Sequence, residues 1–286
     1  MDYIIGILLS SYKPEEVSFK FEGENIVFRM LEAWYDSISK IPGLKAIVLM
    51  DIIPDGFIEK YSTENVKFEK CEPNGELNAI DIRWKIYTKY LQENKHITNA
   101  FFSDVSDVLV LQNPFPHMQP GKIYTGDEDH FDNKPINITW DWMQHRWNLI
   151  RYDERIEQFL KKHSHQKVLN AGLVGGHRDI LIPVISKMAD FLDKYKITGA
   201  TIDMNALNYT LYSEYIDIVV HGAPVNTVFW NNDLYNKDCW FKHKKNSIWT
   251  NKIFLSKQIY AKFFIGIKWI SVHSYFTVIA LSIFGY

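Results

Sequence analysis

The sequence predicts an α/β domain in which helices cover both faces of one mainly parallel sheet. Short runs rich in β-branched and aromatic residues recur along the chain, and helical patterns separate several of them. Strands that alternate with helices usually pair in parallel, because a crossover helix returns the chain to the edge where the previous strand began. With 286 residues, of which 47% are hydrophobic, the chain is long enough to bury one large core.

Eight segments carry the strand pattern, in which apolar and β-branched residues dominate a short run between turn residues. They are YIIGILLSS from residue 3, LKAIVLMD from residue 44, VKFEK from residue 66, NAFFSDVSDVLVLQ from residue 99, GKIYTGDE from residue 121, VLNAGLVGG from residue 168, YIDIVVHG from residue 215 and CWFKHKK from residue 239.

Two segments have the spacing of amphipathic helices. In residues 178–195 the apolar stripe consists of Leu181, Val184, Ile185, Met188, Leu192 and Tyr195. In residues 78–91 the stripe runs from Ala79 to Leu91 and has Arg83 in its middle. A guanidinium on an inward face needs an anion, and the carboxylates of the next strand or a phosphate are natural partners. The alternative is that Arg83 extends to solvent.

The segment WDWMQHRW, residues 140–147, is rich in tryptophan. Its indole rings could stack on the apolar faces of sugar rings. The alternative is an ordinary core helix with Trp140, Met143 and Trp147 turned inward.

Composition excludes several classes of protein. The net charge is −2 and the pI about 6.6, so no basic surface would attract nucleic acid. Cys71 and Cys239 are far apart and lack metal-site spacing, which suits a reducing compartment. The N-terminal apolar run is too short for a signal peptide, and no cleavage pattern follows. We expect a cytoplasmic protein.

The C-terminal end differs in composition from the rest of the chain. Residues 1–250 are predicted to form the main domain, and residues 251–286 an apolar and basic helical tail. The tail contains four lysines, Lys252, Lys257, Lys262 and Lys268, beside a mostly aromatic and aliphatic stretch. It could form helices docked on the main domain or a peripheral membrane anchor. A spanning helix is less favoured, because Lys268 and His273 interrupt the apolar stretch.

Two aspartates stand at the mouth of an apolar strand run, in SDVSDVLVLQNPF. Asp104 and Asp107 are three positions apart and are followed by the apolar residues VLVL. Leaving two carboxylates unpaired at the mouth of a strand is costly, so a cation should meet them. Mn²⁺ and Mg²⁺ take one or two carboxylates together with substrate phosphate oxygens. The alternative is that both aspartates cap a turn.

The order of several motifs resembles nucleotide-sugar glycosyltransferases of the GT-A type. These motifs are the paired aspartates, VLVLQNPF, LNAGLVGG and DMNALNY. The resemblance implies that an Asp-x-Asp element holds a divalent metal against the donor diphosphate. Here the spacing is Asp-x-x-Asp. Asp107 directly precedes VLVL and matches the second, metal-binding aspartate, whereas Asp104 is assigned to the metal or the donor.

The same resemblance bears on later residues. It places an acid near the acceptor at Asp203, where the usual Asp-Gln pair is Asp203-Met204; the ordinary role of such an aspartate is to stabilise a helix N-terminus. Asp127 and Glu128 are rival candidates for a general base, although a solvated acidic loop would explain them too.

Two further motifs supply candidate binding residues. Gly172 allows the backbone to approach a ligand closely, and Asn170 could then bind a sugar hydroxyl; a tight turn after a strand is the alternative. His243 could complete the metal site, with His221 as its competitor, and Lys244 could steady the leaving diphosphate. Residues that could contact the nucleotide base follow the first strand: Ser10, Ser11 and Tyr12.

Together these features predict a metal-assisted transferase. The donor would be a UDP- or GDP-sugar and the acceptor a hydroxyl of a glycan or glycolipid. A sugar-nucleotide pyrophosphorylase is an alternative, but it needs a glycine-rich loop after the first strand, and SSYKPEEVS contains no glycine. A non-catalytic carbohydrate-binding or membrane-associated protein is the other alternative.

Overall fold

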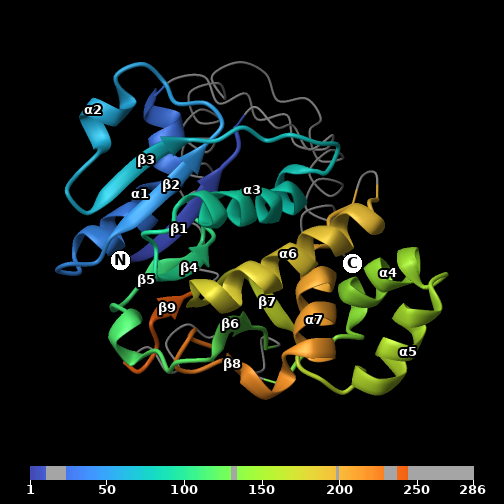
Figure 1. Ribbon diagram of the computed structural model, residues 1–286. Coiled ribbons are helices and arrows are strands. Elements are labelled where there is room, and N and C mark those ends of the chain that lie inside the picture. The colour runs from blue at the N-terminus through green and yellow to red at the C-terminus, as the bar shows by residue number, and fades with distance from the viewer. Residues whose placement is uncertain (11–23, 130–133, 198–199, 229–236, 244–286) are drawn as a thin grey trace, which may run out of the picture. The chain divides into compact units, whose positions relative to one another are not determined.

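The computed structural model describes residues 1–10, 24–129, 134–197, 200–228 and 237–243 (Figure 1). The chain divides into two units, residues 1–245 and 246–286, and all described residues belong to the first. The predicted tail, Ser11, Tyr12 and Lys244 lie outside the described residues. In the ranges given above, no helix has the length and apolar content needed to cross a membrane.

A seven-stranded sheet forms the centre of the unit, with the strand order β3-β2-β1-β4-β7-β6-β8. The strands are β1 (Asp2–Leu8), β2 (Ala46–Met50), β3 (Val66–Lys70), β4 (Asn99–Ser103), β6 (Ile123–Asp127), β7 (Leu169–His177) and β8 (Val219–His221). Strand β7 is antiparallel to β4 and β6, and the other pairings are parallel. The predicted fold class is confirmed, with one strand reversed.

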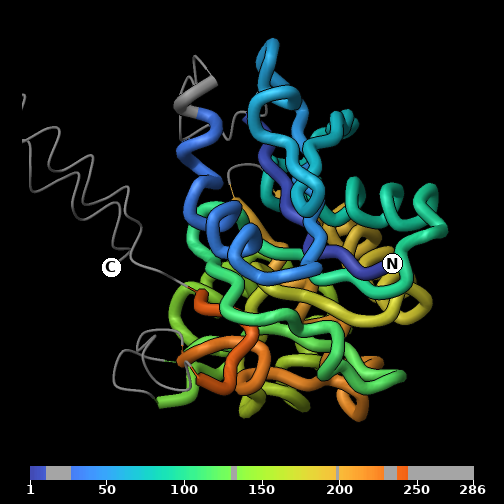
Figure 2. Tube along the Cα trace, turned by 90° about the vertical axis from the view of Figure 1, so that its left-hand side faces the viewer, coloured from blue at the N-terminus to red at the C-terminus, as the bar shows by residue number. Residues whose placement is uncertain are grey.

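Seven helices of the described residues surround the sheet. They are α1 (Glu24–Ser39), α2 (Phe57–Tyr61), α3 (Ala79–Glu93), α4 (Asp141–Ile150), α5 (Glu154–His163), α6 (Arg178–Lys194) and α7 (Asp203–Glu214), and short 3₁₀ turns η1 (Phe115–His117) and η2 (Ile216–Ile218) complete the set. In Figure 1, α3 and α6 lie side by side over the sheet. Figure 2 shows β1 and α1 (blue) in the upper half and α7 and β8 (orange) in the lower half, in keeping with the strand order.

Successive strand residues point to opposite faces and feed two apolar clusters. Ile5 and Phe102 belong to the cluster beneath α3, α6 and α7, whereas Ile4 and Phe101 belong to the cluster that includes α1. All four side chains are almost fully buried. Helices therefore cover both faces of the sheet, as predicted.

Three predicted elements differ from the structure. The run from residue 99 to 112 forms two strands, because the chain bends at residues 105–107 and pairs again only in β5 (Leu109–Val110). Strand β5 pairs antiparallel with β9 (Phe241–Lys242) in a separate two-stranded sheet. The run from residue 215 begins as the turn η2, and only its end is a strand.

The core-helix alternative for residues 140–147 is correct for Met143 and Trp147 and wrong for Trp140. Met143 and Trp147 are fully buried. Trp140 precedes the first turn of the helix and is 43% exposed, because its ring lies outside the stripe that packs inward.

Candidate active site

Most of the predicted site residues lie along one edge of the sheet, the edge formed by the carboxyl ends of its parallel strands. Strands β4 and β6 end there, and β7 begins there because it runs the opposite way. Asp104 follows β4 and donates its backbone N–H to the carbonyl of Gly172, at 2.9 Å. Asp127 ends β6 opposite Leu169, the first residue of β7. Ligands in open α/β sheets commonly bind beyond the carboxyl ends of the strands.

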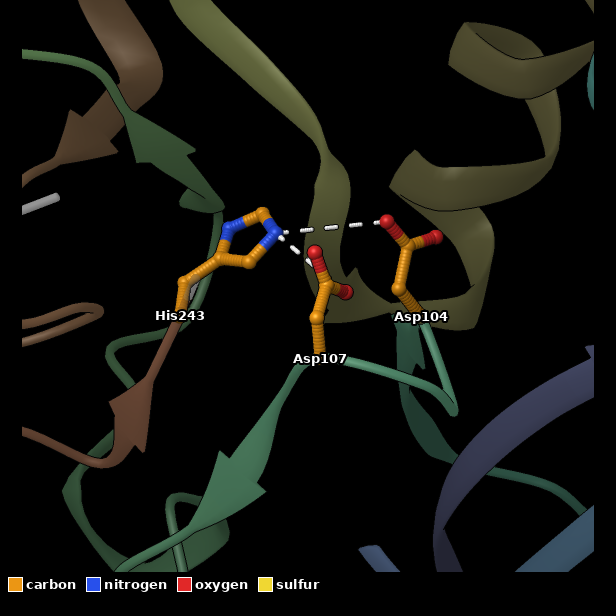
Figure 3. A group of neighbouring side chains, drawn as sticks. All are labelled: Asp104, Asp107 and His243. Carbon is orange, nitrogen blue, oxygen red and sulfur yellow. Dashed lines mark ion pairs between the residues drawn. The ribbon is translucent and has the colours of Figure 1, made fainter. Parts of the chain in front are cut away.

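Asp104, Asp107 and His243 form a cluster at this edge (Figure 3). One donor atom from each lies within 4.8 Å of the other two. His243 Nε2 is 3.9 Å from Asp104 Oδ2 and 3.9 Å from Asp107 Oδ1. The imidazole is fully buried, whereas both carboxylates are partly exposed. The three residues predicted as metal ligands from separate parts of the sequence thus lie together.

The short sheet of β5 and β9 explains how His243 reaches the aspartates. Leu109 pairs with Lys242, so the residue after β9 lies opposite the residues that precede β5. Phe241 anchors β9 in the apolar core, where its ring centroid is 5.0 Å from that of Phe101.

Gly172 forms a backbone wall of the cluster. A Cβ atom at this position would lie 2.6 Å from Asp104 Oδ2 and 2.6 Å from His243 Cε1, closer than atoms can approach. The residue must therefore be glycine if both side chains keep these positions. The predicted close approach of this backbone to a ligand stays a prediction, because the structure shows the approach to the side chains of Asp104 and His243.

Arg83 links the cluster to a second acid. Its Nη1 forms an ion pair with Asp104 Oδ1, and its Nη2 lies 2.7 Å from Asp203 Oδ2. Nη2 also donates to the carbonyl of Ala171, at 3.2 Å. Arg83 is only 9% exposed, so the extension to solvent is ruled out and the inward stripe with an anionic partner is correct. Asp104 thus directs one oxygen to Arg83 and the other toward His243.

Burial and charge act in opposite directions on these groups. Burial lowers the pKa of Arg83, but the carboxylates of Asp104 and Asp203 outweigh it and raise that pKa above its usual range. Burial raises the pKa of Asp203, and the Arg83 charge opposes that shift. Arg83 therefore stays charged, and Asp203 is easier to protonate than an exposed aspartate.

The two acids after β6 have different partners. Asp127 Oδ2 forms an ion pair with Lys167 Nζ at 2.9 Å. The same oxygen lies 2.9 Å from His221 Nδ1. Burial raises the pKa of Asp127, but His221 and Lys167 lower it overall. His221, the rival metal ligand, therefore belongs to this ion-pair group.

Glu128 is connected to the metal cluster through Asn170. Asn170 Nδ2 donates to Glu128 Oε1 at 2.5 Å, and Asn170 Oδ1 accepts from the Gly172 N–H at 2.6 Å. Glu128 and Asn170 are both buried. A single amide side chain thus fixes Glu128 relative to the glycine that touches the proposed ligands.

The sequence interpretation missed two buried acids at the same edge. Asp51 follows β2, and its Oδ1 accepts from Ser10 N at 2.7 Å and Ser10 Oγ at 3.1 Å. The sequence does indicate Asp51 as a site residue, because this carboxylate directly follows the apolar run of a predicted parallel strand. Asp81, in the first turn of α3, gave no such signal, because aspartate is common at the start of any helix.

A groove of about 420 Å³ lies between the end of β3 and helix α3. Cys71, Ile82 and Tyr90 are among its lining residues, and the three residues of the metal cluster are not. Burial raises the pKa of Cys71 to about 12, so the thiol stays protonated at neutral pH. This groove is separate from the candidate site.

Two solved structures resemble the chain in backbone arrangement. The galactosyltransferase LgtC in complex with donor and acceptor sugar analogues is 13% identical, with a TM-score of 0.46, over 85% of this chain and 86% of that chain. An active-site mutant of LgtC is 14% identical, with a TM-score of 0.47 and the same coverage. No protein-family model and no curated protein sequence matches the chain. At these identities and TM-scores, neither structure speaks to the function of this chain.

Proposed function

We propose that the protein is a metal-dependent glycosyltransferase of the GT-A type that moves a sugar from a nucleotide-diphosphate donor to an acceptor hydroxyl. One observation carries the proposal, namely that Asp104, Asp107 and His243 converge at the edge where ligands of such sheets bind. The buried Arg83–Asp203 pair and the Glu128–Asn170 pair border the same cluster. A metal next to two sets of buried acids is an arrangement suited to transfer from a phosphorylated donor.

The donor set fits Mn²⁺ or Mg²⁺. Two carboxylates and an imidazole supply hard oxygen ligands and one nitrogen, and the nitrogen favours Mn²⁺ over Mg²⁺. The bare backbone of Gly172 leaves room for an ion where a Cβ atom would collide with the ligands. When bound, the metal neutralises negative charge on the departing diphosphate. Asp104, Asp107 and His243 would hold it.

The protein's own residues divide the remaining work. Arg83 keeps Asp104 in a fixed orientation, because the guanidinium binds one carboxylate oxygen and leaves the other toward His243. Asp203 lies on the other side of Arg83, and we assign it to the sugar or the acceptor. Asn170 accepts from the Gly172 N–H through Oδ1 and donates to Glu128 through Nδ2. Its amide nitrogen carries a second hydrogen, which can bind a sugar hydroxyl without breaking the bond to Glu128.

Glu128 is a better candidate than Asp127 for taking the proton of the acceptor hydroxyl. Asp127 is committed to Lys167 and His221, which lower its pKa and make it a weaker base. Glu128 lies beside the metal cluster, where its Oε1 accepts from Asn170 Nδ2 at 2.5 Å. We assign the general-base role to Glu128 and a structural role to Asp127.

The donor nucleotide is assigned to the β1 side of the edge. Asp51 fixes Ser10 through two hydrogen bonds, and Ser10, Ser11 and Tyr12 would contact the base of a UDP- or GDP-sugar. Lys244, next to His243, would steady the diphosphate. The acceptor is a glycan or glycolipid hydroxyl approaching from the side of Asp203 and Glu128.

A panel of nucleotide sugars tests the proposal. Each is added with Mn²⁺ to the full chain, and the melting temperature and the release of nucleoside diphosphate are measured. A true donor should raise the melting temperature by mass action and be hydrolysed or transferred only with metal. Asp107→Asn should abolish the metal-dependent signal, whereas Asp190→Asn, on an exposed position of α6, should not. Metal-dependent turnover that survives in Asp107→Asn would overturn the assignment.

We also propose that residues 251–286 contact an anionic membrane surface, which would bring the enzyme to a lipid-linked acceptor. The support is compositional, because aromatic residues alternate with four lysines in this segment.

A further inference from the structure

The three residues before Asp203 are held through their backbone by side chains of two other helices. Asn78 Nδ2 donates to the carbonyl of Ala200 at 3.1 Å. Arg146 Nε donates to the carbonyl of Thr201 at 2.8 Å. The N–H of Ile202 donates to Asp81 Oδ1 at 3.2 Å. We call Asn78, Asp81 and Arg146 the loop clamp.

The loop clamp is itself rigidly built. Asn78 is the N-cap of α3, and its Oδ1 accepts from Ile80 N at 3.0 Å and Asp81 N at 2.9 Å. Its Nδ2 also donates to Asp81 Oδ2 at 2.7 Å. Arg146 lies over the Trp142 ring, 5.0 Å from its centroid, and Nη1 donates to the Trp142 carbonyl. These bonds hold both side chains toward the loop.

The clamp takes the place of an ordinary helix cap. Helix α7 begins at Asp203, and the residue at its N-cap position, Ile202, provides no side-chain hydrogen bond. The start of a helix without a cap frays more readily. Here the three preceding residues are fixed from outside, so the position of Asp203 depends on α3 and α4.

Helix α3 also carries Arg83, which binds Asp203 directly at 2.7 Å. The N-cap and first two turns of α3 therefore bind both the Asp203 carboxylate and the residues that precede Asp203. Arg83 in turn binds Asp104 of the proposed metal site. Any movement of residues 200–202 would change the distance of Asp203 from the reacting sugar.

We propose that Asn78, Asp81 and Arg146 are positioning residues that set the place of Asp203 relative to Arg83 and Asp104; the role of Asp203 in transfer rests on the proposed function. Displacing a reacting group by about 1 Å can cost on the order of a hundredfold in rate. A clamp that acts only on stability would leave the rate per folded molecule unchanged.

Conservative variants separate these two outcomes. Asn78→Asp keeps the cap acceptor but removes the amide that donates to Ala200 and to Asp81. Arg146→Lys keeps the charge but removes the Nε donor to Thr201. Arg151→Lys is the matched control, because Arg151 follows the same helix and pairs with Glu157 away from the loop. With the donor found in the nucleotide-sugar panel, both clamp variants should lose roughly ten- to a hundredfold in kcat. The KM for the donor and the affinity for Mn²⁺ should stay nearly constant, as should all values for Arg151→Lys.

Rescue at Asp81 gives a second test. Asp81→Ala removes the acceptor for Ile202 N–H, whereas Asp81→Asn keeps one oxygen in place, so Asp81→Asn should regain part of the lost kcat. Amide hydrogen exchange should rise at residues 202–205 in Asp81→Ala and Asn78→Asp and stay unchanged in β4. Full kcat with only a lowered melting temperature would overturn the positioning role alone. Failure of the unchanged protein to turn over any nucleotide sugar with Mn²⁺ would overturn the proposed function and the positioning role together.

Discussion

Gly172 leaves no room for a side chain between two of the proposed metal ligands. In Gly172→Ala the new Cβ atom would lie 2.6 Å from Asp104 Oδ2, so the carboxylate or the backbone must shift. We expect Mn²⁺ affinity to fall by roughly 10- to 100-fold, as for other changes that displace ligands. Titration followed by electron paramagnetic resonance measures free Mn²⁺ directly.

Gly126→Ala is the control for this variant. Gly126 belongs to the neighbouring strand β6, and its added Cβ would make only ordinary contacts, at 3.4 Å from Leu173 Cβ and 3.5 Å from Asn170 Cβ. Its Mn²⁺ affinity should match that of the unchanged protein. Equal affinity in both glycine variants would mean that the ion does not bind beside Gly172.

Asp81 should make stability depend on pH. Two effects raise the pKa of Asp81 from 3.8 to about 7 in the folded protein: burial, which is the larger, and the negative charge of Asp203. Between about pH 4 and 7, the folded state therefore holds a proton that the unfolded chain has released, so stability falls as pH rises through this range and levels off above it. Asp81→Asn removes this contribution.

The melting temperature of Asp81→Asn, relative to the unchanged protein, should therefore rise from pH 5 to pH 8 by on the order of a few degrees. Asp190→Asn, at an exposed position of α6, is the control variant against which this change is compared. A constant difference for Asp81→Asn would show that Asp81 ionises normally in the folded protein.

The site residues that the sequence predicts share one property: each is a charged residue within or beside an apolar segment that is expected to be buried. Arg83 interrupts an apolar stripe, and Asp104 and Asp107 interrupt a strand, so the sequence alone indicates that each of them needs a partner of opposite charge. The clamp residues Asn78, Asp81 and Arg146 satisfy local helix preferences, and their partners are backbone atoms far along the chain. Sequence patterns do not reveal such contacts, because every backbone offers the same donors and acceptors.

At the scale of elements, the strand pair of β5 and β9 carries the third proposed ligand into the site. Phe241 is fully buried two residues before His243. Phe241→Leu should cost on the order of 1 kcal/mol of stability through lost packing and should also weaken Mn²⁺ binding, because β9 loses its anchor. Urea unfolding and Mn²⁺ titration measure the two effects separately.

Phe68→Leu provides the comparison. Phe68 is a buried aromatic of the same apolar cluster but lies on the edge strand β3. A similar loss of stability without a loss of Mn²⁺ affinity is expected there. If both variants bind Mn²⁺ equally well, β9 does not position the ligand.

The reversal of β7 illustrates what element patterns omit. The run VLNAGLVGG is apolar in either direction, so its pattern predicts a buried strand but not its orientation. Helices α4 and α5 lie between β6 and β7, yet the chain enters β7 at the edge where it left β6. This reversal puts Asn170 and Gly172 near the carboxyl ends of β4 and β6. The orientation follows from tertiary packing, which the local pattern does not encode.

At the scale of the whole molecule, the described unit and the C-terminal segment are expected to separate in function. The unit of residues 1–245 contains both apolar clusters and the complete proposed metal site. A chain ending at Lys245 should therefore fold, keep its melting temperature within a few degrees and retain Mn²⁺ binding. An insoluble or unfolded product would return residues 251–286 to the core of the domain.

The segment beyond residue 250 should account for membrane binding. Four lysines in it, Lys252, Lys257, Lys262 and Lys268, would each contribute on the order of 1 kcal/mol at an anionic surface, and the aromatic residues would insert at the headgroup boundary. The full chain should sediment with vesicles containing phosphatidylserine, and the chain ending at Lys245 should not.

Replacing the four lysines by glutamine should weaken sedimentation with these vesicles, and raising the salt concentration should weaken it for the full chain, because both act on the electrostatic part alone. Equal sedimentation of the full and shortened chains would assign membrane binding to the α/β unit, and no sedimentation of either would remove the anchor from the proposed function.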